Sequence, residues 1–251
     1  MIQLHPLAAI GEVVPGDGLA RLLAVAVSAT DIFPERNDVL VVTQKIVSKA
    51  EGRFVELAGI TPGARAIELA KVTRKDARLV ELILGESTAV VRAAPDVLIT
   101  RHRSGHVMAN AGIDRSNLGA SNQDRVLLLP LDADASAERL RTALCVYWPS
   151  PPAVVISDSF GRPWRLGVTN VAIGVSGLPA LLDRRGEADR NGRKLEVTRV
   201  ALGDLIASAA GLVTGEAAES VPAVLVRGLR WSTRDCPAAA LVRPLDEDLF
   251  R

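Results

Sequence analysis

The sequence predicts one α/β or α+β unit, and three observations support this prediction. Apolar segments typical of buried strands alternate with amphipathic segments of helical period along the whole chain. The 251 residues are 48% hydrophobic and 24% charged, which is typical of a globular protein rather than of a disordered chain or a coiled coil. We find no repeat, low-complexity tract or clear linker, so a single intimately built unit is favoured over two separate domains.

The elements follow one another as short strands and amphipathic helices. Helical spacing predicts a helix over 19–28, which Asp17 can cap, and a proline run at 149–152 ends another helix predicted over 135–147. Pro222 suits a strand start or an edge. The predicted strands cover residues 2–4, 39–42, 89–92, 97–100, 125–129, 153–156, 168–175, 195–202 and 221–226, and the remaining predicted helices cover 61–84, as one or two helices, and 204–213.

Composition excludes several classes of function. Thirty Lys and Arg residues against 29 Asp and Glu residues give a net charge of +1, without the basic excess of a nucleic-acid-binding protein. Cys145 and Cys236 are too few for a disulfide framework and lack zinc-ligand spacing, so two unpaired thiols are favoured. No apolar run reaches the ~18 residues that span a bilayer, and the N-terminus does not read as a signal peptide. We therefore expect a cytoplasmic protein without membrane or nucleic-acid partners.

The common catalytic and nucleotide-binding motifs are absent from the sequence. It contains neither of the glycine-rich phosphate-binding motifs nor the G-x-S-x-G elbow of hydrolases. His102 and His106 stand four residues apart beside Gly105, and ordinary polar roles are favoured over metal ligation for this pair. Any nucleotide must therefore be held in another way.

Four polar clusters begin where apolar elements end, which is where ligand groups gather. In the first, residues 43–53, Lys45 and Lys49 suit phosphate, although this segment alone favours a solvated basic face. In the second, residues 109–117, Asp114 and Asn117 can present two oxygens to a ligand or form a structural Asx turn.

The third and fourth clusters extend this pattern. Residues 157–167 place Asp158 at the end of a buried strand, followed by Ser159, Arg162 and Arg165, which combines a cation ligand with anion clamps. Residues 213–220 offer Glu216 among small residues, or are an ordinary loop. Carboxylates with hydroxyl neighbours suit Mg²⁺ or Mn²⁺, so the clusters together favour metal-assisted handling of a phosphate-bearing substrate.

Four segments occur in the order found in one known family. They are residues 45–53 (KIVSKAEGR), 110–117 (NAGIDRSN), 157–162 (SDSFGR) and 221–228 (VPAVLVRG). The chain resembles the coenzyme F420-0:L-glutamate ligases, or gamma-glutamyl ligases, from about residue 4 to residue 228. The resemblance implies that residues 229–251 are a tail, similar to the junction with an FMN-binding domain in fused enzymes, so the chain is a candidate fragment of a longer protein.

The resemblance also implies a function, a fold and a set of site residues. It implies GTP-dependent ligation of L-glutamate to coenzyme F420-0, with one or more gamma-linked additions, through an acyl phosphate, with two Mg²⁺ or Mn²⁺ ions and K⁺. The implied fold is an α+β, mixed-sheet arrangement that forms an intertwined homodimer. The implied metal ligands are Asp114, Asp158, Ser159 and Glu216, and the implied catalytic residues are Asp158 and Arg162. The implied GTP contacts are Ile10, Gly11, Glu12, Val13, Gln44, Lys45, Lys49, Asn117, Thr214, Gly215, Glu216, Ala217, Ala218, Glu219, Ser220 and Val221. Two alternatives remain open: a metal-dependent ligase for another carboxylate, and a GTP-binding subunit without catalysis.

Overall fold

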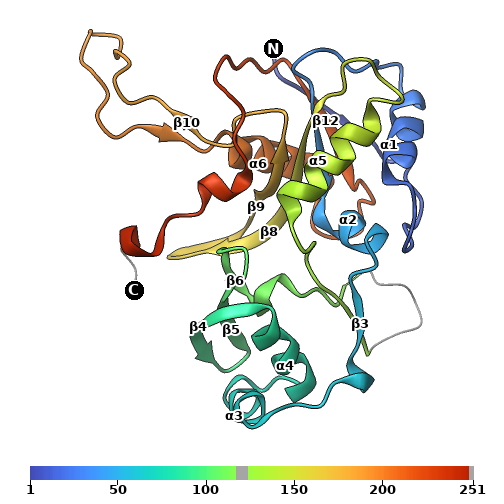
Figure 1. The fold of residues 1–251 in the computed structure, drawn as a ribbon, viewed down its shortest axis with the longest axis vertical. Coiled ribbons are helices and arrows are strands. Elements are labelled where there is room, and N and C mark those ends of the chain that lie inside the picture. Colours follow the sequence, from blue (N-terminus) through green and yellow to red (C-terminus); the bar gives the residue numbers. More distant parts are fainter. Residues whose placement is uncertain (117–123, 249–251) are drawn as a thin grey trace.

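A five-stranded mixed sheet forms the centre of the protein (Figure 1). The computed structural model describes residues 1–116 and 124–248. Within the sheet, β2 and β8 run parallel, and the other neighbouring strands run antiparallel. In spatial order the strands are β1 (Gln3–Pro6), β12 (Ala223–Arg227), β2 (Val39–Thr43), β8 (Ala153–Arg162) and β9 (Arg165–Ser176). The predicted α+β class with a mixed sheet is confirmed.

Helices cover both faces of this sheet. Helices α1 (Leu19–Ser28) and α5 (Ala133–Leu144) pack on one face, and α6 (Leu202–Thr214) packs on the other. Successive residues of β2 alternate between the two cores. Leu40 and Val42 belong to the cluster with α1 and α5, whereas Val39 and Val41 belong to the cluster with α6. A strand that is buried on both faces needs an uninterrupted apolar run, which is why the sequence signal was so clear here.

A small lobe with its own core is inserted between β2 and α5 (Figure 1). Its apolar cluster is formed mainly by helices α3 and α4 and by the strands beside them. The segment 61–84, predicted as one or two helices, forms two, and the two predicted neighbouring strands pair antiparallel. The elements of this lobe are β3 (Phe54–Glu56), α3 (Ala64–Thr73), α4 (Ala77–Gly85), β4 (Ser87–Ala94), β5 (Val97–His102), β6 (Val107–Ala109) and β7 (Arg125–Leu127).

The structure corrects two local predictions and decides between two alternatives at a third position. The strand predicted over 195–202 is reduced to β11 (Arg199–Val200), which pairs only with β10 (Leu182–Asp183) in an exposed extension, because no second layer covers this segment. Asp17 does not cap α1, since its carboxylate accepts a hydrogen bond from the Val14 amide instead. Pro222 directly precedes β12, which lies inside the sheet, so the strand-start alternative is the correct one.

The segment after β12 crosses the molecule to the small lobe. Ala238 is fully buried, Val242 lies against Gly105, and Arg101 pairs with Asp248 at 3.0 Å. Both cysteines are free thiols, as predicted. None of the helices in the described residues is long and apolar enough to cross a membrane.

We expect Arg227→Ala to destabilise the protein by about 3 kcal/mol, because it leaves a buried carboxylate without its partner. The Arg227 guanidinium at the end of β12 lies 2.7 Å from Asp38, whose side chain is only 2% exposed. Denaturant unfolding measures the change. Arg185→Ala is the matched control, since Arg185 and Asp183 form a solvent-exposed pair whose loss should cost much less than the loss of a partner to a buried carboxylate. An equal loss in both variants would contradict this assignment.

Candidate active site

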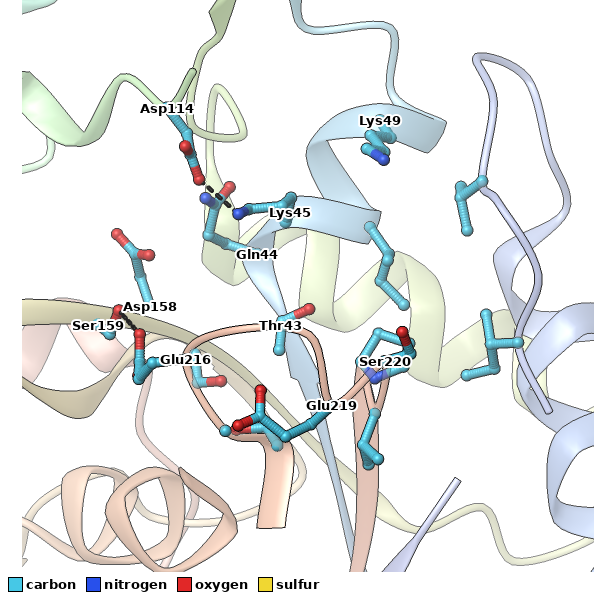
Figure 2. Close-up of a pocket in the computed structure, with 18 of the residues that line it drawn as sticks. Thr43, Gln44, Lys45, Lys49, Asp114, Asp158, Ser159, Glu216, Glu219 and Ser220 are labelled. Atoms are coloured by element: carbon cyan, nitrogen blue, oxygen red, sulfur yellow. Dashed lines mark hydrogen bonds and ion pairs between the residues drawn. The ribbon is translucent and has the colours of Figure 1, made fainter. Parts of the chain in front are cut away.

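A cavity of about 500 Å³ lies where β2 ends beside the middle of β8, next to the start of α2 (Gln44–Ala50) (Figure 2). Because β2 and β8 are parallel, with Thr43 opposite Ser157, the segment that follows β2 lies beside the part of β8 that carries Asp158 and Ser159. The strand predicted to end at residue 156 in fact continues to Arg162, because it pairs with β9 over this length. The loop after α6 and the loop over 10–13 complete the wall. Segments far apart in the sequence therefore meet around one space.

All four polar clusters contribute side chains to this cavity. The predicted residues that line it are Ile10, Gly11, Glu12, Val13, Gln44, Lys45, Lys49, Asp114, Asp158, Ser159 and the whole of 214–221. Asn117 lies outside the described residues. Arg162 does not line the cavity: it is exposed near the tip of the hairpin formed by β8 and β9, where its Nη2 donates to the Leu166 carbonyl.

The two lysines lie one turn apart on α2, which begins directly after β2. Lys45 Nζ lies 2.7 Å from Asp114 Oδ2 and also donates to the Ser116 hydroxyl at 3.0 Å (Figure 2). Lys49 Nζ lies 2.6 Å from Glu12 Oε1, and the Lys49 side chain is only 6% exposed. The alternative of a solvated basic face is therefore wrong, because both ammonium groups are held at the cavity.

Asp114 enters the cavity wall from the small lobe, where its backbone bridges to Leu127. Burial alone would favour the neutral acid. Hydrogen bonds from Lys45 and from the Ser116 amide nevertheless hold the pKa of Asp114 below its usual range. The carboxylate is therefore ionised at neutral pH, in contact with a cationic partner.

Asp158 is in the opposite electrostatic situation. Burial raises the pKa of its carboxyl to about 7, and the nearby charges of Asp114 and Glu216 act in the same direction, against a hydrogen bond from the Ser159 amide and the charge of Lys45. Glu216 Oε2 accepts a hydrogen bond from the Ser159 hydroxyl at 2.9 Å (Figure 2). The three acidic groups predicted to act together therefore face the same space and influence one another.

These oxygens have the chemistry that Mg²⁺ and Mn²⁺ prefer, but they are not gathered into a finished metal site. Among the described residues, no three His, Cys, Asp or Glu side chains lie close enough to hold one ion. Asp114 is engaged by Lys45, and Glu216 is engaged by Ser159. A divalent ion would have to draw these carboxylates away from their present partners.

Several lining residues were not predicted to be in the site. They are Thr43, Ile46, Ser157, Asn170 and Pro222. Asn170 lies opposite Ser159 in the register of β8 and β9, and its side-chain amide lies 3.4 Å from the Thr214 hydroxyl. Only strand pairing places it there, whereas Ser157 carried a sequence signal because it directly precedes Asp158.

The histidine pair lies apart from this cavity, in the small lobe. The ring nitrogens of His102 and His106 are 2.7 and 2.8 Å from the Ser104 hydroxyl. Burial lowers the pKa of His106 to about 4, so the ring is neutral at physiological pH. This geometry agrees with the structural role that was favoured.

Comparison of the sequence with known proteins assigns the chain to a family. Residues 8–228 match the family described as F420-0:Gamma-glutamyl ligase. The chain belongs to this family. A protein of Methanopyrus kandleri named coenzyme F420:L-glutamate ligase is 45% identical over 254 residues, which cover 100% of this chain and 98% of the relative.

Two further relatives carry the same name. The protein of Methanothermobacter thermautotrophicus is 43% identical, with 94% of this chain and 93% of the relative covered. The protein of Halobacterium salinarum is 42% identical, with 99% and 96% covered. The resemblance seen in the four sequence segments is thus confirmed over nearly the full length of the chain.

Proposed function

We propose that the protein joins L-glutamate to coenzyme F420-0 through an amide bond, in coenzyme F420 biosynthesis. The observation that carries the proposal is the meeting of Lys45, Lys49 and the three carboxylates of Asp114, Asp158 and Glu216 around one cavity, in a chain of the F420-0:gamma-glutamyl ligase family. Ligation of a carboxylate to an amine needs an activated acyl group. The lysines and the metal-binding oxygens suit a nucleoside triphosphate as the activator, for which we propose GTP.

The charges around the cavity support a requirement for cations. In the described part of the chain, its charged lining residues are five acids and two lysines: Glu12, Asp114, Asp158, Glu216, Glu219, Lys45 and Lys49. A polyanionic triphosphate would be repelled from this excess of carboxylates unless cations bound with it. Two Mg²⁺ or Mn²⁺ ions on Asp114, Asp158, Ser159 and Glu216, with K⁺, would supply that charge and polarise the transferring phosphoryl group.

The proposed reaction has two steps. The terminal carboxylate of F420-0 attacks the γ-phosphorus of GTP, which forms an acyl phosphate and releases GDP. The amine of L-glutamate then attacks the acyl carbon, loses a proton and expels phosphate, which leaves the amide. Because phosphoryl transfer depends mainly on positioning and electrostatics, we assign Lys45 and Lys49 to phosphate oxygens and the loops over 10–13 and 214–221 to the nucleotide. A catalytic role for Arg162 stays a prediction.

We also propose that the protein acts as a homodimer. The hairpin of β8 and β9 projects from the sheet and exposes apolar side chains: Trp164 is 81%, Leu166 99% and Val168 52% exposed. Apolar side chains gathered on one projecting arm are typical of a protein-protein interface. The same arm continues from Asp158, so a partner that covered it would lie close to the site.

The decisive experiment is a product assay with the purified protein, GTP, Mn²⁺, L-glutamate and F420-0. We expect the F420-0 mass to rise by one glutamyl unit or more, with GDP formed in step, and neither change without GTP. Absence of the mass gain, beside a working family relative as positive control, would contradict the proposal.

The same assay separates the two alternatives. Release of GDP with another carboxylate, but not with F420-0, would identify a metal-dependent ligase of different specificity. Binding of GTP without GDP release would identify a nucleotide-binding subunit without catalysis. The presence of all three acidic residues at the cavity favours a working enzyme over such a subunit.

A further inference from the structure

Ser157, which lines the cavity, carries a buried hydroxyl that has no hydrogen-bond partner among residues 1–116 and 124–248. Its side chain belongs to β8, directly before Asp158, and only 2% of the residue is exposed. Among the described residues, no group forms a hydrogen bond with its Oγ atom. Its backbone is paired in the sheet, opposite Thr43 of β2 and Ala172 of β9, so the hydroxyl is not needed to cap a strand or a turn.

An unpaired hydroxyl in this position is unfavourable for the fold alone. It has lost its hydrogen bonds to water, and no group in the described part of the chain replaces them. Alanine at the same position would fill nearly the same space without this penalty, and the preceding buried positions of β8, Ala153 to Ile156, are all apolar. Ser157 is nevertheless one of the residues that line the cavity, so a ligand bound there would lie beside this position of β8.

We propose that Ser157 is a substrate-binding residue, whose hydroxyl donates a hydrogen bond to an oxyanion of the bound reactants. The inference rests on the proposed function, which fills this cavity with phosphates and with the carboxylate that they activate. The cavity already holds an excess of acceptors, because Asp158 and Glu216 also line it, so a hydrogen-bond donor is the group that an anionic ligand needs there. Phosphate and carboxylate oxygens share the chemistry that this hydroxyl would recognise.

The test compares Ser157→Ala with the wild type, in ligand-free stability and in binding of each ligand. Thermal unfolding without ligands is expected to show an unchanged or higher Tm, because the variant removes an unsatisfied group. Calorimetric titrations with GTP plus Mn²⁺, with F420-0 and with Mn²⁺ alone are expected to show about a tenfold loss of affinity for one oxyanionic ligand. A loss for GTP places the hydroxyl on a phosphate, and a loss for F420-0 alone places it on the carboxylate.

Thr100→Val is the matched control. The Thr100 hydroxyl in β5 is also fully buried and without a partner among the described residues, but it lies in the small lobe and outside the wall of this cavity. Its removal should give a similar or larger gain in Tm with unchanged affinity for all three ligands. The comparison therefore separates the removal of an unsatisfied hydroxyl from the removal of a ligand contact.

Three results would overturn the assignment while leaving the proposed function intact. The first is a lower Tm for Ser157→Ala, which would mean that the fold itself uses the hydroxyl. The second is unchanged affinity for every ligand. The third is a loss of affinity for Mn²⁺ alone, which would mean that the oxygen ligates the ion. A wild-type protein that binds neither GTP nor F420-0 would instead overturn the proposed function and this assignment together.

Discussion

Asp158→Asn is expected to abolish glutamate ligation and, at the same time, to stabilise the metal-free protein at pH 8. The carboxyl has a pKa near 7 in the folded protein against 3.8 without the fold, because burial and the charges of Asp114 and Glu216 oppose its ionisation. Asparagine keeps the shape of the side chain but carries no charge. It therefore removes the electrostatic penalty together with the proposed metal ligand.

The sign of this effect follows from proton binding. Between pH 4 and pH 7 the folded state holds more protons at Asp158 than the unfolded state does, so the unfolding free energy falls as the pH rises through this window. The full penalty is reached above pH 7 and is at most about 4 kcal/mol. The advantage of Asp158→Asn should thus be near zero at pH 4 and greatest at pH 8, in denaturant unfolding without metal ions.

Asp183→Asn is the control for this result. Asp183 is exposed, and its hydrogen bond with Arg185 lowers the pKa of its carboxyl to about 2, so its removal relieves no penalty. Ligase activity of both variants is measured at pH 8. Retained turnover in Asp158→Asn would show that ligation does not need the carboxylate of Asp158. A loss of stability that does not depend on pH would show that this carboxylate imposes no electrostatic penalty on the folded protein.

Lys45→Gln is expected to tighten binding of Mn²⁺ to the nucleotide-free protein several-fold, and to weaken binding of GTP. Lys45 Nζ lies 2.7 Å from Asp114 Oδ2, so an ion that takes this carboxylate must first displace the ammonium group. Both side chains are about one quarter exposed, at 25% and 24%, and such a pair contributes up to about 1 kcal/mol, or a factor near five. Electron paramagnetic resonance of free Mn²⁺ measures the first effect, and calorimetry measures the second.

Lys49→Gln is the matched control, because it removes the same charge from the same cavity but frees Glu12 rather than Asp114. A double-mutant cycle adds Asp114→Asn to each lysine variant, and the effect of Lys45 should vanish in that background. Equal effects of the two lysines, or an effect of Lys45 that persists without the Asp114 charge, would mean that the ion pair does not compete with the metal.

The order of the elements could be predicted from the sequence because the spacing of apolar residues within each element indicates which of its faces is buried. The run over 39–42 is buried on both faces, and the spacing of Leu19, Leu23 and Val27 marks one buried side of a helix, so both local patterns gave the correct element. The pattern over 195–202 failed because alternation requires a core to face, and Val197 is 84% exposed. Alternation of apolar and polar residues predicts a buried strand only where another layer of the protein covers one face of that strand.

By itself, the sequence determined the class of fold, the family and four polar segments, since these depend on residues that are near one another in the chain; three of the segments follow the end of an element, whereas 157–162 lies within β8. Only the tertiary structure decided which side chains of those segments share a space. The parallel pairing of β2 with β8 brings Lys45 and Asp158 to one edge, the small lobe adds Asp114, and the length of β8 carries Arg162 past the cavity. The physical reason is that strand register and lobe packing are set by contacts between distant residues, which no local pattern encodes.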